Sequence, residues 1–258
     1  MKRCPVANER LRAAILASGL GIQATADAVG VDRKTIERWI SGRTPYRRHQ
    51  YALASLLAVD LPYLWPDSRP TEEVSAMGQA EVVAIYPHRS VVPSDLWMTI
   101  FQRAADQLDV LAFSAFWLSE DRAFHQLLRD KAKAGVAVRM LFGDPDSPEV
   151  AQRGEDEGIG PAMAAKVRNA ILNYGNLPTV GGIEFRLHQT ILYNSLYRAD
   201  DELLVNTHVH GVGAYLAPVM HLRHVPGADL FTTYVESFER VWESARPLSL
   251  TTSATVAR

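Results

Sequence analysis

The chain has 258 residues, of which 47% are hydrophobic and 22% are charged, a composition typical of a globular protein with an ordinary core. It contains no apolar run long enough to span a bilayer, and its start lacks the apolar stretch of a signal peptide, so we expect a cytoplasmic protein with no membrane partner. The single cysteine, Cys4, excludes intramolecular disulfides and metal sites made of cysteine alone.

Charge is distributed unevenly along the chain. Residues 1–70 hold 11 Lys and Arg against 6 Asp and Glu, whereas residues 71–258 hold 16 against 23. The formal net charge of −2 therefore hides a basic N-terminal part and an acidic remainder. Any attraction for the phosphates of a nucleic acid is concentrated in the first 70 residues.

The first 66 residues have the apolar periodicity of five short helices. The predicted segments are 8–18, two helices within 21–42, 47–57, and the short apolar stretch 61–66. Because all of them are short and amphipathic, we expect them to pack into one small all-α domain.

The stretch 21–42 predicts two helices joined by a tight turn. Gly30 can adopt the left-handed conformation that such a turn needs, and Asp32 is a favourable N-cap for the second helix. Behind this cap, Ile36, Trp39 and Ile40 fall at helical spacing and face inward. The outward face is then short, polar and basic, which suits the major groove of DNA. It consists of Arg33, Lys34, Thr35 and Arg38.

The segment VGVDRKTIERWISGRTP resembles the helix-turn-helix of the lambda-repressor-like, xenobiotic-response-element family of bacterial regulators. The resemblance covers residues 7–66 and departs from the family at Thr25, where leucine is usual. The resemblance implies that the second helix of the 21–42 stretch contacts base edges or the DNA backbone. It also implies that residues beside this helix contact DNA phosphates. The residues expected to bind DNA are Gln23, Arg33, Lys34, Thr35, Arg38 and Arg43. The alternative is an all-α interaction module whose basic face is merely solvated.

Residues 67–80 lose the apolar periodicity and gain Pro, Ser, Gly and Glu, which indicates a linker. After it, residues 81–247 alternate short apolar runs with amphipathic helices and form a second domain, and residues 248–258 have no core-forming pattern and are expected to be a tail. The fold class predicted is thus α plus α/β, with an all-α five-helix helix-turn-helix domain followed by an α/β domain with a mixed sheet.

Within the second domain the order strand, helix, strand implies parallel pairing with right-handed crossovers. The expected strands are 81–87, 109–116, 136–144 and 183–189, with helices over 94–107, 120–135, 162–172 and 229–245. Residues 190–211 predict a hairpin that turns at 199–202.

This order resembles one half of a phospholipase-D-like domain, whose enzymes carry histidine, any residue, lysine, four residues and aspartate, followed six residues later by Gly-Ser. One alignment places these positions on Tyr193, Ser195 and Asp200, with His208 near the end. A second starts at His188 and places the aspartate on Ser195. Both alignments lose the lysine that would hold the phosphoryl oxygens, so we expect no catalytic residues and no enzyme activity.

The remaining polar residues indicate a retained pocket that binds a small ligand, a phosphorylated one among the candidates. The expected ligand-binding residues are His188, Tyr193, Ser195, Asp200, His208 and His210, with Arg153 and Arg168 as holders of an anion. His208 and His210 can also be read as a metal-binding pair on one strand face, or as a hydrogen-bonded core pair. No third metal ligand is identified, and no metal or cofactor is expected.

The expected function is that of a sequence-specific DNA-binding transcriptional regulator. We expect a repressor rather than an activator, with a second domain that senses the ligand and mediates dimerisation. The partners are a double-stranded DNA operator, a second copy of the chain and the unknown ligand. Pairing is expected because modules of this kind read paired half-sites and because single phospholipase-D halves tend to pair. Two alternatives are a phosphodiesterase or nuclease targeted by its N-terminal domain, and an antitoxin or structural DNA-binding partner with no pocket.

Overall fold

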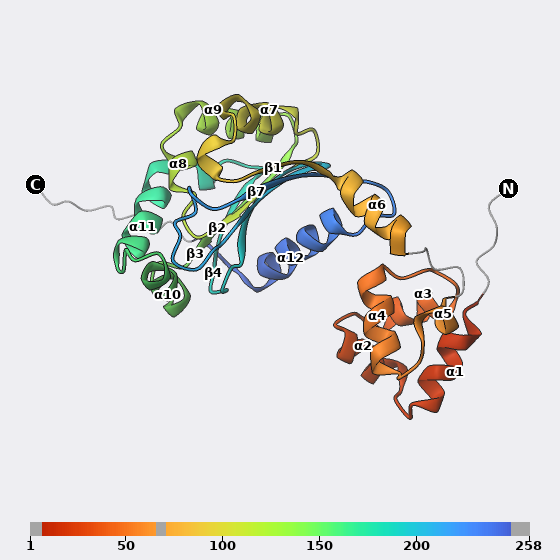
Figure 1. Cartoon of the computed structure of the whole chain (residues 1–258). Helices are drawn as coiled ribbons and strands as arrows, with labels where there is room; N and C mark the ends of the chain where they lie inside the picture. The colour runs from red at the N-terminus through yellow and green to blue at the C-terminus, as the bar shows by residue number, and fades with distance from the viewer. Residues whose placement is uncertain (1–6, 66–70, 249–258) are drawn as a thin grey trace, which may run out of the picture. The chain divides into compact units, whose positions relative to one another are not determined.

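The computed structural model describes residues 7–65 and 71–248, and within 71–75 it describes the backbone only. The chain divides into two compact units, Met1–Met77 and Gly78–Arg258 (Figure 1). Helix α6 (Thr71–Glu81) occupies most of the segment 67–80, and the boundary between the two units, at Met77 and Gly78, lies within this segment. Nearly all of the predicted tail, 248–258, lies outside the described residues.

Residues 7–65, the larger part of the smaller unit, form five helices. They are α1 (Glu9–Ala17), α2 (Ile22–Val29), α3 (Arg33–Ile40), α4 (Arg47–Leu56) and α5 (Leu61–Leu64). Leu11, Ile36 and Leu53 are fully buried at their common centre. Tyr51 of α4 is 53% exposed and lies outside this core.

The turn between α2 and α3 forms as the local sequence dictates. Gly30 ends α2 in the left-handed conformation, with φ of 70°. Asp32 then caps α3, since its carboxylate accepts from the backbone N–H of Thr35 and from the Thr35 hydroxyl, each at 2.8 Å. Thr25 is fully buried, but its hydroxyl donates to the Gly21 carbonyl at 3.0 Å, so a polar residue is accommodated where the resembling family has leucine.

The larger unit is built on a mixed sheet of eight described strands, as the sequence predicts for this domain. The strands are β1 (Val82–Tyr86), β2 (Gln107–Ala112), β3 (Ala137–Gly143), β4 (Ile183–His188), β5 (Asn194–Ala199), β6 (Glu202–Thr207), β7 (Val219–Arg223) and β8 (Arg246–Pro247). Their order in the sheet is β1-β7-β6-β5-β2-β3-β4-β8.

Only the centre of the sheet has the parallel pairing that was predicted, with β2 beside β3 and β3 beside β4. The expected parallel pairing of β1 with β2 is wrong: β1 lies at the edge, antiparallel to β7, and β5 takes the free side of β2. The strand β7 was not predicted, because its short sequence VMHLR has no clear alternation. The hairpin is confirmed, and Ala199 pairs with Glu202 at its turn.

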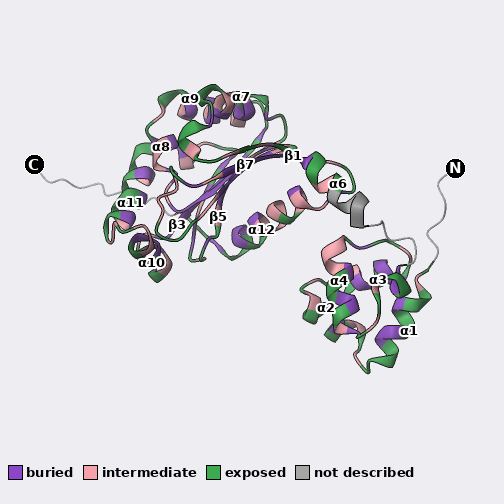
Figure 2. Ribbon diagram, in the orientation of Figure 1, coloured by how far each residue is buried: buried purple, intermediate pink, exposed green. Residues whose placement is uncertain are grey.

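Helices cover both faces of this sheet. They are α7 (Ser94–Arg103), α8 (Phe116–Ser119), α9 (Arg122–Lys133), α10 (Pro148–Asp156), α11 (Ala162–Tyr174) and α12 (Leu230–Ser244), with the short 3-10 turns η1 (Arg89–Val91) and η2 (Leu177–Thr179). In Figure 1, α12 lies on one side of the sheet, and α7, α8 and α9 lie on the other. The buried positions of these helices are turned toward the sheet (Figure 2). None of the described helices has the length and apolar composition needed to cross a bilayer.

Two buried polar contacts fix α12 against the sheet. The carboxylate of Glu81 accepts from the backbone N–H groups of Leu230 and Phe231, each at 2.9 Å, and so caps the first turn of α12. Further along, Arg139 of β3 bonds to both Asp109 of β2 and Glu239 of α12, at 2.7 to 3.0 Å. These contacts attach the helix to a defined place on the sheet.

Candidate functional site

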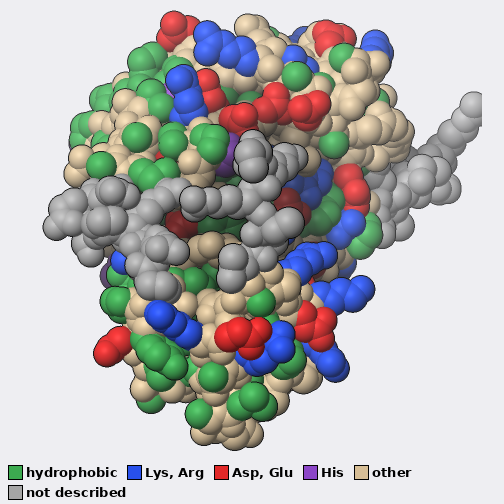
Figure 3. All heavy atoms as spheres, turned by 90° about the vertical axis from the view of Figure 1, so that its right-hand side faces the viewer, with side chains coloured by type: hydrophobic (Ala, Val, Ile, Leu, Met, Phe, Trp, Pro, Cys, Tyr) green, Lys and Arg blue, Asp and Glu red, His purple; other side chains and the backbone are tan. Residues whose placement is uncertain are grey.

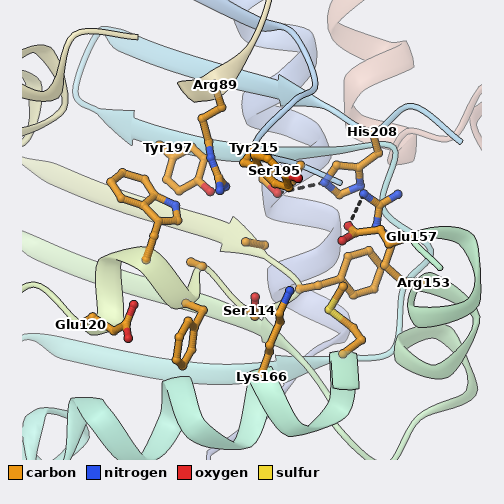
Figure 4. Close-up of a pocket in the computed structure, with 17 residues that line it drawn as sticks. Arg89, Ser114, Glu120, Arg153, Glu157, Lys166, Ser195, Tyr197, His208 and Tyr215 are labelled. Atoms are coloured by element: carbon orange, nitrogen blue, oxygen red, sulfur yellow. Dashed lines mark hydrogen bonds and ion pairs between the residues drawn. The ribbon is translucent and has the colours of Figure 1, made fainter. Parts of the chain in front are cut away.

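A cavity of about 190 Å³ opens where β2 ends, in the middle of the sheet (Figure 4). Its walls come from the segment after β2, from β5, from the residue after β6, from η1, from helices α8, α10 and α11, and from the loop before β7. The carboxyl ends of parallel strands are a usual place for ligand sites in α/β proteins, because the chain leaves the sheet there toward its two faces.

Ser195 and His208 meet at this cavity. The Ser195 hydroxyl lies 3.0 Å from Nε2 of His208, and Nδ1 of the same ring lies 3.0 Å from the Leu192 carbonyl. Since a carbonyl can only accept, Nδ1 carries the proton and Nε2 accepts from the serine hydroxyl. Burial, followed by the positive charges of Arg153 and Arg89, lowers the pKa of His208 to about 4, so the ring is neutral at pH 7.

Three cationic side chains point into the cavity from separate elements: Arg89 from η1, Arg153 from α10 and Lys166 from α11 (Figure 4). Arg89 lies over the ring of Trp117, 5.5 Å from its centroid, and Arg153 lies 6.0 Å from that of Phe113. Arg153 is only 6% exposed. A cavity lined in this way favours an anionic or oxygen-rich molecule.

Several hydrogen-bond donors at the cavity have no acceptor. Among the described residues, Nε of Arg153, the hydroxyl of Tyr197 and Nε1 of Trp117 are buried without a hydrogen-bond partner. All three residues line the cavity. Buried donors are rarely left unpaired, since each costs about 1–3 kcal/mol when unsatisfied. These donors therefore line the cavity with groups that suit acceptor oxygens.

Of the residues predicted to bind a ligand, the structure brings three to this cavity: Ser195, His208 and Arg153. His188 does not line it. Its ring is buried beside Phe113, where Nε2 lies 3.3 Å from the Ala112 carbonyl and Nδ1 accepts from the Thr190 amide at 3.3 Å. Burial lowers the pKa of His188 to about 4, and the residue serves the packing of the strand ends.

The other four predicted residues lie away from the cavity. Tyr193 is 79% exposed at a second cavity, and Arg168 pairs with Asp146 at 2.6 Å on the surface. His210 is exposed in the loop after β6, 3.9 Å from Asp156.

Asp200, the fourth of these residues, lies away from the cavity for a structural reason. It occupies the β5–β6 turn with φ of 49°, and its carboxylate accepts from the backbone N–H groups of residues 105, 106 and 107 at 2.6 to 3.0 Å. Because this carboxylate accepts from three backbone N–H groups, it holds the segment before β2 in place and does not bind a ligand.

His188 lies apart from Ser195 in the sheet, because β3 and β2 separate β4 from β5. His208 and His210 do not share a strand face either, since β6 ends at Thr207. Within residues 7–65 and 71–248 no group of three or more His, Cys, Asp or Glu side chains is arranged to hold a metal ion.

Sequence reasoning missed several cavity residues, among them Arg89, Trp117, Glu157 and Lys166. Arg153 and Glu157 are spaced four apart on one helix, a signal that indicates an ion pair but not where the pair faces. Arg89 and Lys166 lie on elements distant in sequence, and no local pattern connects them with Ser195.

The residues predicted to bind DNA all lie in the smaller unit, on α2, on α3 and just after α3. Lys34 and Arg38 are exposed and one helical turn apart on α3. Arg33 is paired with Glu37 at 2.8 Å, and Gln23 with Asp27 at 2.9 Å. The hydroxyl of Thr35 is used by the Asp32 cap, and Arg43 is exposed after α3. Basic and acidic side chains are interspersed on the face of this unit that is turned to the viewer in Figure 3.

Acidification should destabilise the larger unit through its buried histidines. The pKa values of His188 and His208 are about 4 in the folded chain, against an ordinary 6.5, so the unfolded chain binds more protons between pH 6.5 and 4. The free energy of unfolding should therefore fall as the pH drops through this window, by about 1.4 kcal/mol per pH unit for each histidine at most.

Urea unfolding at several pH values measures this slope. His125, whose pKa is also lowered by burial, contributes in the same direction, so the double variant His188→Gln with His208→Gln should retain a shallower slope. A slope unchanged by the double variant would show that these two histidines are not the groups that titrate.

Residues 79–249 match the model of a protein family described as a domain of unknown function, DUF5919, and the chain belongs to this family. No curated protein matches the chain significantly.

Three solved structures are similar over part of the chain. TrmBL2, an archaeal chromatin protein whose structure is described as showing a novel mode of DNA binding, is 12% identical over 69% of this chain and 60% of its own, with a TM-score of 0.42. The phospholipase D family member Nuc from Salmonella typhimurium is 15% identical over 60% of this chain and 89% of its own, with a TM-score of 0.35.

The third is phosphatidylserine synthase from Haemophilus influenzae Rd KW20, 15% identical over 72% of this chain and 45% of its own, with a TM-score of 0.39. The chain thus spans less than two thirds of the length of TrmBL2 and of the synthase. At TM-scores below 0.5, none of the three defines the fold of this chain.

Proposed function

We propose that the protein is a sequence-specific DNA-binding transcriptional regulator whose larger unit senses a small ligand. The observation that carries the proposal is the α2–α3 turn. Gly30 and Asp32 set the start of α3, Ile36 and Trp39 bury its inner face, and the outer face is left polar and basic. A helix held in this way by a preceding helix is how helix-turn-helix proteins read the major groove.

The cavity supports the sensing role. We propose that the larger unit is a phospholipase-D-like domain that has lost its catalytic pair, since Tyr193 and Ser195 stand where the resemblance calls for histidine and lysine. Tyr193 also lies outside the cavity. What remains is a set of buried donors and cations around a space of about 190 Å³, which suits binding better than phosphoryl transfer.

In this proposal a ligand acts by binding one arrangement of the two DNA-reading units of a homodimer more tightly than another. A ligand shifts an equilibrium only by its difference in affinity for the two states, so ligand and DNA must influence each other's binding reciprocally.

Selection from a pool of random DNA duplexes tests the DNA-binding part. Repeated capture by the purified full chain should enrich a repeated half-site whose two copies are about 10 base pairs apart, centre to centre. DNase footprinting should then protect that site. Enrichment of no sequence over the starting pool would rule out a sequence-specific regulator.

A second candidate function, a phosphodiesterase or nuclease, is favoured by one observation, the Ser195–His208 hydrogen bond, which has the form of a nucleophile with its base. Against it, a base with a pKa of about 4 accepts a proton weakly at neutral pH. An assay of bis(4-nitrophenyl) phosphate hydrolysis distinguishes such an enzyme from a regulator that only binds its ligand. Turnover that is lost in both Ser195→Ala and His208→Ala would establish an enzyme, whereas we expect no turnover above the buffer rate.

A further inference from the structure

The cavity already contains one carboxylate in contact with its most buried cation. Glu157 lies 2.5 Å from the guanidinium of Arg153, and both side chains are at least nine-tenths buried. Yet neither Nε nor Nη2 of Arg153 has a well-directed hydrogen bond to any described residue. The two groups are close, but the carboxylate does not satisfy the N–H donors of the guanidinium.

Two carboxylates, Glu157 and Glu120, line the cavity together with its three cations, and the unpaired donors exceed what Glu157 can satisfy. Arg89 and Lys166 also point inward, and the unpaired Tyr197 hydroxyl and Trp117 Nε1 lie on the same walls (Figure 4). An oxyanion with several acceptor oxygens can bond a guanidinium in a bidentate manner and use the other donors as well. The carboxylate of Glu157, held at the end of α10, cannot reach all of these donors at once.

We infer that the Glu157 carboxylate occupies the place of a ligand's oxyanion, and that a small molecule carrying a phosphate or a carboxylate binds here by displacing Glu157 from Arg153. This inference rests on the proposed ligand-sensing function and names its ligand class and its internal competitor. The cavity of about 190 Å³ is smaller than the range of about 300–1,000 Å³ usual for drug-sized ligands, so the ligand is small.

The position of Glu157 connects its displacement with the loop that covers the cavity. Glu157 is the C-cap of α10, and the carbonyl of its neighbour Asp156 accepts from the N–H of Gly211 at 3.1 Å. Gly211 belongs to the loop between β6 and β7, which also carries His208 and Tyr215 into the cavity. Release of Glu157 therefore acts directly on the segment that anchors this loop.

Isothermal titration of the full chain in Tris chloride tests the inference. Phenyl phosphate, inorganic phosphate and benzoate probe the two oxyanion types, and phenol is the uncharged counterpart. Three variants are compared with the natural sequence: Glu157→Gln, Arg153→Gln and, as the matched control, Glu155→Gln. Glu155 is exposed on α10 and does not line the cavity.

Glu157→Gln should strengthen binding of the preferred oxyanion about ten-fold, because the competing charge is gone. Arg153→Gln should weaken it about ten-fold or more, since it removes charge-assisted hydrogen bonds to the oxyanion. Glu155→Gln should stay within about two-fold of the natural sequence, as expected of an exposed charge, and phenol should not bind. Whichever of phosphate and benzoate responds to Glu157→Gln identifies the oxyanion.

Equal oxyanion affinity in the natural chain and in Glu157→Gln would overturn the inference and leave ligand sensing in place. If no oxyanion binds even to Glu157→Gln, the inference and the sensing role both fail, while duplex selection still reports on DNA binding by itself. Because Glu157→Gln removes a charge without shortening the side chain, the result does not depend on whether Arg153→Gln folds.

Discussion

Replacing Asp109 by asparagine should destabilise the larger unit by about 3–5 kcal/mol, the range for breaking a buried ion pair from one side. Asp109 is 1% exposed and bonds Arg139 at 2.8 and 3.0 Å, with Arg198 at 3.3 Å. Burial lowers the pKa of Arg139, but its bonds to Glu239 and Asp109 outweigh this and raise the pKa, so the guanidinium stays charged. Without Asp109, that charge loses its fully buried carboxylate partner and keeps the half-exposed Glu239.

Urea unfolding followed by circular dichroism measures this loss. The matched control is Asp201→Asn. The Asp201 side chain is 77% exposed and lies 3.6 Å from His224. Because this pair is exposed, the control should change the free energy of unfolding by no more than about 0.5 kcal/mol. If Asp109→Asn costs no more than the control, the network between β2, β3 and α12 does not hold the helix on the sheet.

The combined variant Lys34→Ala with Arg38→Ala should weaken binding to the selected duplex by about 100-fold or more, because each lost contact to a base edge contributes about 1–3 kcal/mol. Both side chains are exposed on the outer face of α3. The slope of log affinity against log salt should also become shallower wherever these charges meet phosphates.

Arg12→Ala is the control, because it removes an exposed cation from α1, outside this face. Fluorescence anisotropy of a labelled duplex gives both dissociation constants, and we expect the control to stay within about three-fold, the size of a general electrostatic effect. A double variant that binds as tightly as the control would exclude α3 as the recognition helix.

The elements that could be predicted from the sequence are those fixed by neighbours in the chain. Gly30, Asp32 and the inward spacing of Ile36, Trp39 and Ile40 define the α2–α3 unit locally, and the structure has these features. The hairpin turn at 199–202 is local in the same sense. By contrast, the place of β1 depends on β7, which lies more than 130 residues away, so the pairing could not be deduced from strand order.

The same distinction separates the site residues that were found from those that were missed. Ser195 and His208 come together because β5 and β6 form one hairpin, in which Asn194 pairs with Thr207 beside them. Arg89 and Lys166 reach the cavity from elements that only the folded sheet brings near. The surroundings of His188 could not be predicted, because its position at the end of β4 does not reveal that its ring nitrogens face backbone groups.

The coupling of ligand and DNA is tested most directly by anisotropy titrations of the selected duplex with the full chain, without ligand and at a saturating concentration of the preferred oxyanion. A regulator that senses this ligand should show a change of about five-fold or more in the Kd for DNA, in line with usual coupling energies of about 1–3 kcal/mol. The same Kd with and without a ligand shown to occupy the cavity would contradict the proposed coupling.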